Sequence, residues 1–205
     1  MPRPKTVSDD DVVSATGRVL QRVGPARFTL ADVAAESGIS PATLIQRFGS
    51  KRALMVAFAR AESAKAAAPF ESARRSNASP LGALRVALAG VSEHFRSRQD
   101  VANGLAVLLD DITDDEMRAA AALHAETTED AIHVLLDEAV AAGELNVSET
   151  GDLAKSVQAA WNGAVIQWAL RGVGSFEAWL APVLAPLLGP QPPNKRARAT
   201  SGRRQ

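Results

Sequence analysis

The sequence predicts an all-α protein, and three observations support this fold class. Apolar residues recur at helical spacing wherever the chain shows a period, whereas β-branched residues seldom alternate with polar ones. Alanine is abundant and tyrosine is absent. Capping residues and Gly or Pro stops divide the apolar runs into segments of helical length. We therefore expect helices along the chain and no sheet.

Three short helices are expected in the first 50 residues, and the first two begin at the same kind of cap. Ser8 followed by Asp11 forms a capping pattern, and apolar residues then recur until Gly24 ends the first helix. Thr29 and Asp32 repeat the pattern before a second, shorter helix. Both helices are amphipathic, so we expect them to share a core.

A tight turn and an immediate restart define the third helix. Gly38 permits the turn, and Ser40 is an N-cap residue with Pro41 at the first helical position. Leu44 and Phe48 lie one turn apart and would face the core. The segment is a helix-turn-helix whose outer face is formed by Pro41, Ala42, Thr43, Gln46 and Arg47.

Longer helices are expected beyond residue 50, at about 50–66, 81–98, 101–110, 113–142, 149–171 and 175–188. Residues 69–80 are polar and rich in Ser and Arg, which predicts a loop. Pro182 and Pro186 indicate that the last helix is bent or broken. We divide the chain into a helix-turn-helix domain (1–50), a larger helical domain (51–188) and a disordered basic tail (189–205).

Composition limits the classes of protein that fit. The 205 residues include 46% apolar residues, which is ample for a core, and no cysteine, which excludes disulfides and thiolate metal sites. No apolar run approaches the roughly 18 residues of a membrane span, and the first residues do not resemble a secretory signal. We expect a cytoplasmic protein without a membrane partner.

Charge is segregated although the net charge is zero. Residues 1–60 carry nine Lys or Arg against five Asp or Glu, residues 61–188 carry nine against eighteen, and residues 189–205 carry five against none. Basic ends suit a polyanionic partner, although a charged face is often only a solvated one. Arg3 and Lys5 on the N-terminal arm would enter a minor groove or remain disordered.

The helix-turn-helix suits double-stranded DNA. A short helix with a capped N-terminus and an exposed polar face fits the major groove, and Ala42 and Thr43 allow close approach. The amides near Thr29 and the side chain of Lys51 can reach the phosphate backbone. A helical hairpin that merely packs would show the same spacing.

Residues 12–58, from "VVSATGRVLQRVG" through "TLADVAAESGISPATLIQRFGSKRALMVAF", resemble the DNA-binding domain of the TetR family of bacterial transcriptional regulators. The family usually has Tyr where this chain has Ile45, so Ile45 touches a thymine methyl or sugar, or enters the core. The resemblance implies a ligand-responsive regulator, a repressor, that binds a palindromic operator as a homodimer and releases it on binding its effector. The DNA-binding residues expected from it are Thr29, Ser40, Pro41, Ala42, Thr43, Ile45, Gln46, Arg47 and Lys51.

Apolar stripes on the last two helices are the expected dimer interface, since the family pairs such helices in a four-helix bundle. The core of a monomer would produce the same stripes. The interface residues are Val165, Trp168, Trp179, Leu180, Val183, Leu184 and Leu187.

The resemblance also implies a small-molecule effector in the second domain, and the apolar content favours a largely apolar one. Candidate lining residues are the bulky side chains of the middle helices, although each of them would also serve in ordinary packing. They are Phe95, Leu105, Leu109, Met117, His124, Trp161 and Asn162.

No enzyme, cofactor or metal site is expected. The three histidines lack metal-ligand spacing, and no P-loop or GxSxG pattern occurs. Capping at a helix junction explains one carboxylate cluster better than a cation does; its members are Asp110, Asp111, Asp114, Asp115 and Glu116. The alternative function is a helical small-molecule-binding or protein-interaction module without DNA binding.

Overall fold

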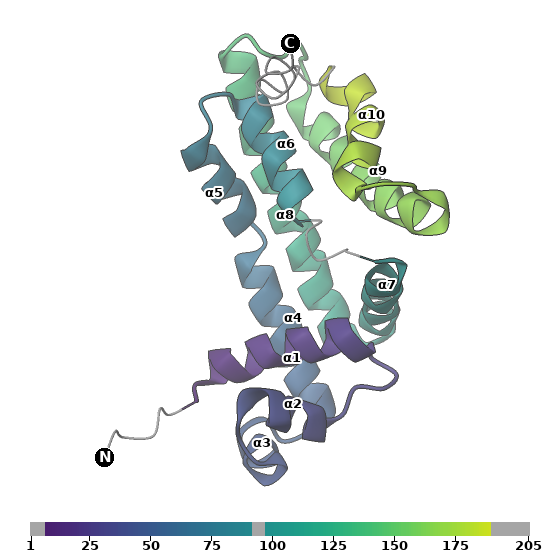
Figure 1. Ribbon diagram of the computed structural model, residues 1–205. Helices are drawn as coiled ribbons and strands as arrows, with labels where there is room; N and C mark the ends of the chain where they lie inside the picture. Colours follow the sequence, from purple (N-terminus) through teal and green to yellow (C-terminus); the bar gives the residue numbers. More distant parts are fainter. Residues whose placement is uncertain (1–6, 92–96, 190–205) are drawn as a thin grey trace, which may run out of the picture.

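The computed structural model describes residues 7–91 and 97–189, which form helices and no strand (Figure 1). The predicted all-α fold is confirmed. The helices are α1 (Asp9–Val23), α2 (Leu30–Ser37), α3 (Pro41–Phe48), α4 (Lys51–Lys65), α5 (Ala68–Ser76), α6 (Pro80–Val91), α7 (Arg98–Thr113), α8 (Asp115–Ala141), α9 (Thr150–Arg171) and α10 (Phe176–Leu188).

The first two helices begin at the predicted capping boxes. The Ser8 hydroxyl accepts a hydrogen bond from the Asp11 amide at 3.1 Å, and the Asp11 carboxylate accepts one from the Ser8 amide at 2.9 Å. Thr29 and Asp32 make the same pair of bonds, both at 3.2 Å. Each box satisfies two amides that a helix N-terminus leaves without partners, which fixes where the helices start.

Two hydrophobic clusters lie at opposite ends of the molecule. The N-terminal cluster joins α1–α3 to the start of α4, and its fully buried members include Val12, Phe28 and Leu54. The C-terminal cluster joins α5, α6 and α8–α10 and includes Leu84 and Leu136. The long α8 and the pair α4–α5 run from one end to the other (Figure 1).

Helix α8 contributes to both clusters. Met117 on its first turn packs in the N-terminal cluster, whereas Ile132 and Leu136 pack in the C-terminal one. The buried hydroxyl of Ser63 on α4 donates to the Ala120 carbonyl on α8 at 2.6 Å. This contact ties the C-terminal end of α4 to the second turn of α8.

The structure corrects two predictions about secondary structure. Residues 69–80 were predicted to be a loop, but most of them form α5, because Pro69 occupies a first-turn position and Phe70 and Ala73 are buried. Of the two alternatives predicted for the last helix, a bend or a break, the break is absent, because α10 continues through Pro182 and Pro186. Both prolines are exposed, so water can satisfy the carbonyls that they leave without an amide partner.

Several predictions concern residues outside the described ranges. They are the arm residues Arg3 and Lys5, the basic tail from residue 190, and Phe95. Among the described helices, none combines the length and apolar character that a bilayer crossing requires.

Candidate nucleic-acid interface and effector cavity

Helix α3 lies at one end of the molecule (Figure 1), and most of its side chains are exposed. The Ser40 hydroxyl accepts a hydrogen bond from the Thr43 amide at 3.0 Å and lies 2.9 Å from the Thr43 hydroxyl. Gly38, with φ +75°, makes the turn that separates α2 from α3. Leu44 is only 1% exposed and anchors α3 to the N-terminal cluster. The anchored and capped helix therefore holds its outer face in a fixed orientation.

The predicted base-reading residues share this outer face. Ile45, in the place where the TetR family usually has Tyr, is 46% exposed and is not part of the core. Thr43 is half-buried because its hydroxyl lies against the cap. The other members are exposed, and they are Ser40, Pro41, Ala42 and Gln46.

The predicted phosphate-binding side chains have intramolecular partners. The Arg47 guanidinium pairs with Asp9 and donates to the Val7 carbonyl at 3.0 Å. It therefore attaches α3 to the start of α1. The Lys51 ammonium lies 3.5 Å from the Pro25 carbonyl and 5.2 Å from the centre of the Phe28 ring.

The predicted phosphate-binding residues differ in how readily they could bind DNA. Lys51 is exposed at the start of α4 and has only a long hydrogen bond and a cation–π contact to exchange for a phosphate. Arg47 would have to break an ion pair and a hydrogen bond. Thr29 uses its hydroxyl and amide in the capping box with Asp32.

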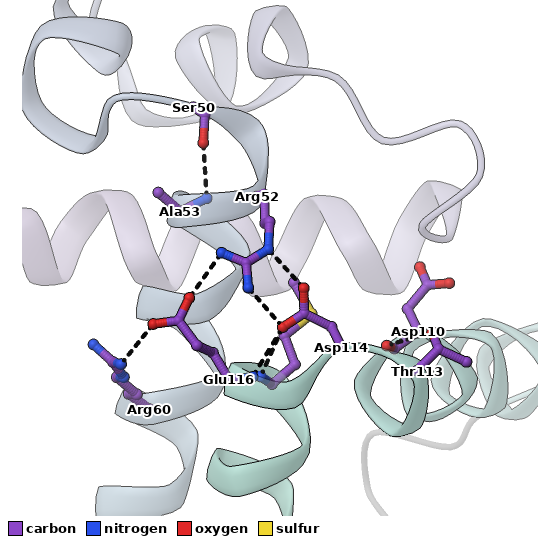
Figure 2. A network of polar contacts seen from close by, with 9 residues as sticks. Ser50, Arg52, Ala53, Arg60, Asp110, Thr113, Asp114 and Glu116 are labelled. Atoms are coloured by element: carbon purple, nitrogen blue, oxygen red, sulfur yellow. Dashed lines mark hydrogen bonds and ion pairs between the residues drawn. The ribbon is translucent and has the colours of Figure 1, made fainter.

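An ion network joins the N-terminal turn of α4 to the junction of α7 and α8 (Figure 2). The Arg52 guanidinium donates to Asp114 at 2.6 and 2.8 Å and to Glu116 at 2.7 Å. Glu116 also accepts from Arg60 at 3.3 Å. Hydrogen bonds from Arg52 hold the pKa of Asp114 below its ordinary value, with help from the Met117 amide.

The predicted carboxylate cluster lies at this junction. Asp114 caps α8 by accepting from the amides of Glu116 and Met117 at 3.0 and 3.2 Å. Capping and ion pairing thus account for the position of Asp114. Among residues 7–91 and 97–189, no three histidine or acidic side chains gather in a way that could hold a metal ion.

A cavity of about 450 Å³ lies between α4, α7, α8 and α9. Its lining is mainly apolar, with contributions from Met55, Phe58 and Val165. Polar side chains also line it, among them His124, Gln158 and Asn162. A neighbouring cavity of about 380 Å³ lies between α1, α4 and α7. The size and lining of the cavity between α4, α7, α8 and α9 suit a small, largely apolar molecule.

Four of the predicted effector-binding residues line this cavity: Leu105, His124, Trp161 and Asn162. Two others do not. Leu109 is 64% exposed on α7, and Met117 is buried in the N-terminal cluster. Asp111 was predicted only as a member of the acidic cluster, although it lines the cavity. A helical plot of α7 places Asp111 three and seven residues after the lining residues Leu108 and Gly104, which is the signal that could have found it.

Four of the seven residues predicted for the dimer interface are buried in the protein's own core, and the other three are half-buried beside it. Trp168 is 9% exposed and packs edge-on against Phe176, with 5.8 Å between the ring centres. Val165, Leu180 and Leu184 are buried, and the remaining predicted residues pack against the same cluster; these are Trp179, Val183 and Leu187. Apolar periodicity identifies the buried side of a helix but not which chain buries it.

Comparisons with known proteins agree with the sequence resemblance. Residues 12–58 match the sequence profile of the family described as bacterial regulatory proteins, tetR family. A search of curated proteins finds no match.

Solved structures resemble the chain over most of its length. A TetR transcription regulator from Haloarcula marismortui has a TM-score of 0.72 at 14% identity and covers 88% of this chain and 95% of its own. A TetR-family regulator from a Rhodococcus species has 0.67 at 20%, covering 87% and 96%. The fatty acid degradation regulator FadR from Bacillus halodurans has 0.64 at 14%, covering 90% and 100%. The chain thus has the fold of a TetR-family transcriptional regulator, and the resemblance seen in the sequence is confirmed.

Proposed function

We propose that the protein is a ligand-responsive transcriptional regulator that binds a palindromic operator as a homodimer. In this proposal it is a repressor that releases DNA when a small, largely apolar effector enters the cavity between α4, α7, α8 and α9. The observation that supports it most directly is the exposed face of α3. The buried Leu44 anchors this helix, and Ser40 caps its N-terminus.

DNA recognition would divide between two sets of residues. Ile45 and Gln46, together with the exposed first turn of α3, would read base edges in the major groove. Lys51 and the N-terminal amides of α2 would contact phosphates and set the register. Arg47 would act mainly by attaching α3 to α1, because its guanidinium already binds Asp9.

A second copy would dock on an exposed stripe of α9 that lies outside the buried face described above. Its members follow helical spacing and are Ala159, Gly163, Ile166 and Leu170. Leu170 is 71% exposed, and an added Cβ at Gly163 would meet no atom within 4 Å. Small residues in such a stripe let two helices approach closely, and a twofold axis would pair the stripe with itself.

Helix α7 would transmit the signal, because it lines the cavity and also contacts the DNA-binding domain. The Asn103 side chain, 7% exposed, donates to the Gln21 carbonyl of α1 at 2.7 Å. An added Cβ at Gly24 would lie 2.6 Å from the Asn103 amide oxygen, so the fit is close. A ligand that shifts α7 would therefore move α1. A coupling of about 1–3 kcal/mol would change DNA affinity roughly 5- to 150-fold.

The test is selection of bound sequences from a random duplex library, followed by titration of the enriched duplex. We expect an inverted repeat whose half-sites are about one helical turn apart. Gln46→Ala should weaken binding and relax the preference at one position of each half-site, whereas the exposed control Asn146→Ala should change neither. No enriched sequence and no complex at low salt would instead favour the module without DNA binding.

A further inference from the structure

Charge is distributed unequally in the lining of the cavity between α4, α7, α8 and α9. Two carboxylates, Glu62 and Asp111, belong to it. No lysine or arginine of the described residues does. Because such a cavity repels anions, we propose that its ligand is an organic cation with a bulky apolar body, and that Asp111 is the counter-ion. This inference rests on the proposed function, in which the cavity is the effector site.

Asp111 is the carboxylate without compensation. It is half-buried and has no hydrogen bond or ion pair to any residue of the described ranges. Its neighbours Asp114 and Asp115 pair with Arg52 and Arg118. Asp110 differs in another way, because it is exposed to water. Glu62 at the cavity edge lies 3.7 Å from the Lys65 ammonium.

The surroundings of Asp111 favour a bound positive charge. Burial, with the nearby charges of Asp110 and Asp114, raises the pKa of Asp111 to about 6. The group is therefore mostly ionised at neutral pH. A half-buried carboxylate without a partner is unfavourable in the empty protein, and a ligand cation beside it would remove that cost.

The rest of the lining fits the apolar body of such a ligand. Phe58 and Trp161 supply aromatic rings, which attract cations as well as apolar groups. The Gln158 side-chain amide donates to the Ala125 carbonyl at 3.1 Å, so its oxygen remains as an acceptor for a ligand N–H. Leu105 and Val165 complete the apolar wall.

A metal ion fits the same lining poorly. Divalent cations in proteins take six or more oxygen ligands or a compact set of nitrogen and oxygen ligands. In the part of the chain that the structure describes, no group of three such side chains comes together. One carboxylate without an ion-pair partner in a mainly apolar cavity instead matches a single delocalised or alkylated positive charge.

The test compares ligands that are matched in shape and differ in charge. Calorimetric titration of the full-length protein at pH 7.5 would use tetraphenylphosphonium against tetraphenylborate, and benzyltrimethylammonium against its uncharged carbon isostere neopentylbenzene. We expect each cation to bind at least about 10-fold more tightly than its counterpart, a difference of about 1.4 kcal/mol.

Variants test which residue is the counter-ion and whether the ligands bind in this cavity. Asp111→Asn, which is isosteric, should lower the affinity for the cation about 10-fold and leave the affinity for neopentylbenzene unchanged. Asp110→Asn removes the same charge from the adjacent exposed position and should have little effect. Leu105→Trp, which fills the cavity, should abolish binding of both.

The outcomes separate this inference from the proposed function. If the neutral or anionic ligand binds as tightly as its cationic match, the inference is overturned while the effector cavity stands. If Asp110→Asn and Asp111→Asn weaken cation binding equally, Asp111 is not the counter-ion. If none of the four ligands binds, both the inference and the effector cavity are rejected.

Discussion

Asp111 shows how one residue can lower stability and still serve binding. Its pKa is about 6 in the folded protein and 3.8 in the unfolded chain, so the folded state binds the proton more tightly. The cost is fully present above about pH 6 and disappears as the pH falls toward 4. Asp111→Asn should therefore raise the free energy of unfolding at pH 7 by about 1 kcal/mol, less than the whole pKa shift implies because the half-buried group is screened by water.

The measurement is urea denaturation of wild type and variant at pH 7.5 and pH 4.5. The gain should be present at the higher pH and small at the lower one. Asp110→Asn serves as the comparison. Its carboxylate is exposed and raises the pKa of Asp111 less than burial does, so its gain should be smaller than that of Asp111→Asn. An equal gain at both pH values would show that ionisation of Asp111 is not the cause.

Two other carboxylates have the opposite dependence on pH. Hydrogen bonds from Arg18 and Arg22 lower the pKa of Glu36, and those from Arg52 lower the pKa of Asp114. Their contribution to stability is present above the ordinary values of 4.5 and 3.8 and is lost as the pH falls through the lowered ones. The decline of stability in acid should therefore begin below about pH 4.5 and persist in Asp111→Asn.

Lys51 gives a residue-scale prediction for DNA binding. Its ammonium is held near the start of α2 by the Phe28 ring and the Pro25 carbonyl, where a phosphate would meet the helix N-terminus. Lys51→Ala should weaken binding to all sequences alike and lower the slope of log affinity against log salt by about one unit. Lys65→Ala, at the far end of the same helix, should leave the slope unchanged. An unchanged slope in Lys51→Ala would remove it from the phosphate contacts.

At the scale of elements, one buried side-chain amide joins α7 to α1 by a hydrogen bond. Asn103 donates to the Gln21 carbonyl at 2.7 Å and accepts from the Gln99 side chain at 2.9 Å. Asn103→Ala would leave that carbonyl buried with one partner fewer, and we expect a loss of about 1–3 kcal/mol in the free energy of unfolding. The exposed Asn162→Ala should cost much less. Urea denaturation measures both, and equal losses would contradict a specific role for the α7–α1 contact.

The sequence predicted those elements whose ends are chemically marked. Ser8, Thr29 and Ser40 are side-chain caps, and each begins a helix where expected. Helix α5 was missed because its N-cap, Ala67, makes no side-chain bond and its polar residues conceal the buried Phe70 and Ala73. Local signals locate helix ends well, whereas burial is decided by neighbours far away in the sequence.

The same distinction applies to the candidate sites. The outer face of α3 could be predicted because the spacing within one helix fixes what opposes Leu44. The cavity could be predicted only in part, because its lining comes from four helices. Asp111 lies within a run of acids in which Asp114 caps a helix, Asp115 forms an ion pair and Asp110 is exposed. Only the three-dimensional position of α7 shows that Asp111, unlike the other acidic residues of this run, lines the cavity.

At the scale of the whole molecule, the two hydrophobic clusters are joined by helices that span both. Helix α8 packs in each cluster, and the Arg52 network links the start of α4 to the start of α8 (Figure 2). A shift of the helices around the cavity could therefore be transmitted to the DNA-binding end through α4 and α8. What a single chain lacks is the second reading helix that a palindromic operator requires.

We expect the second copy of the chain to bind at the exposed stripe of α9. Gly163 lies in the stripe with open space around it, so Gly163→Arg should fit the isolated chain while placing a charge where two stripes would meet. We expect wild type to sediment as a dimer and Gly163→Arg as a monomer with a helical circular dichroism spectrum close to that of wild type. Its DNA affinity should fall by at least about 100-fold, because one reading helix makes too few contacts.

Val86→Arg is the matched control for this variant, since Val86 is 52% exposed on α6, away from the stripe. It adds the same charge to an exposed helical position and should leave both the dimer and DNA binding intact. Trp168→Glu would give no such separation, because Trp168 is buried against Phe176 and its loss would disturb the core. A Gly163→Arg protein that still sediments as a dimer would show that the subunits meet on another face, since an arginine pair on the twofold axis would be both bulky and repulsive.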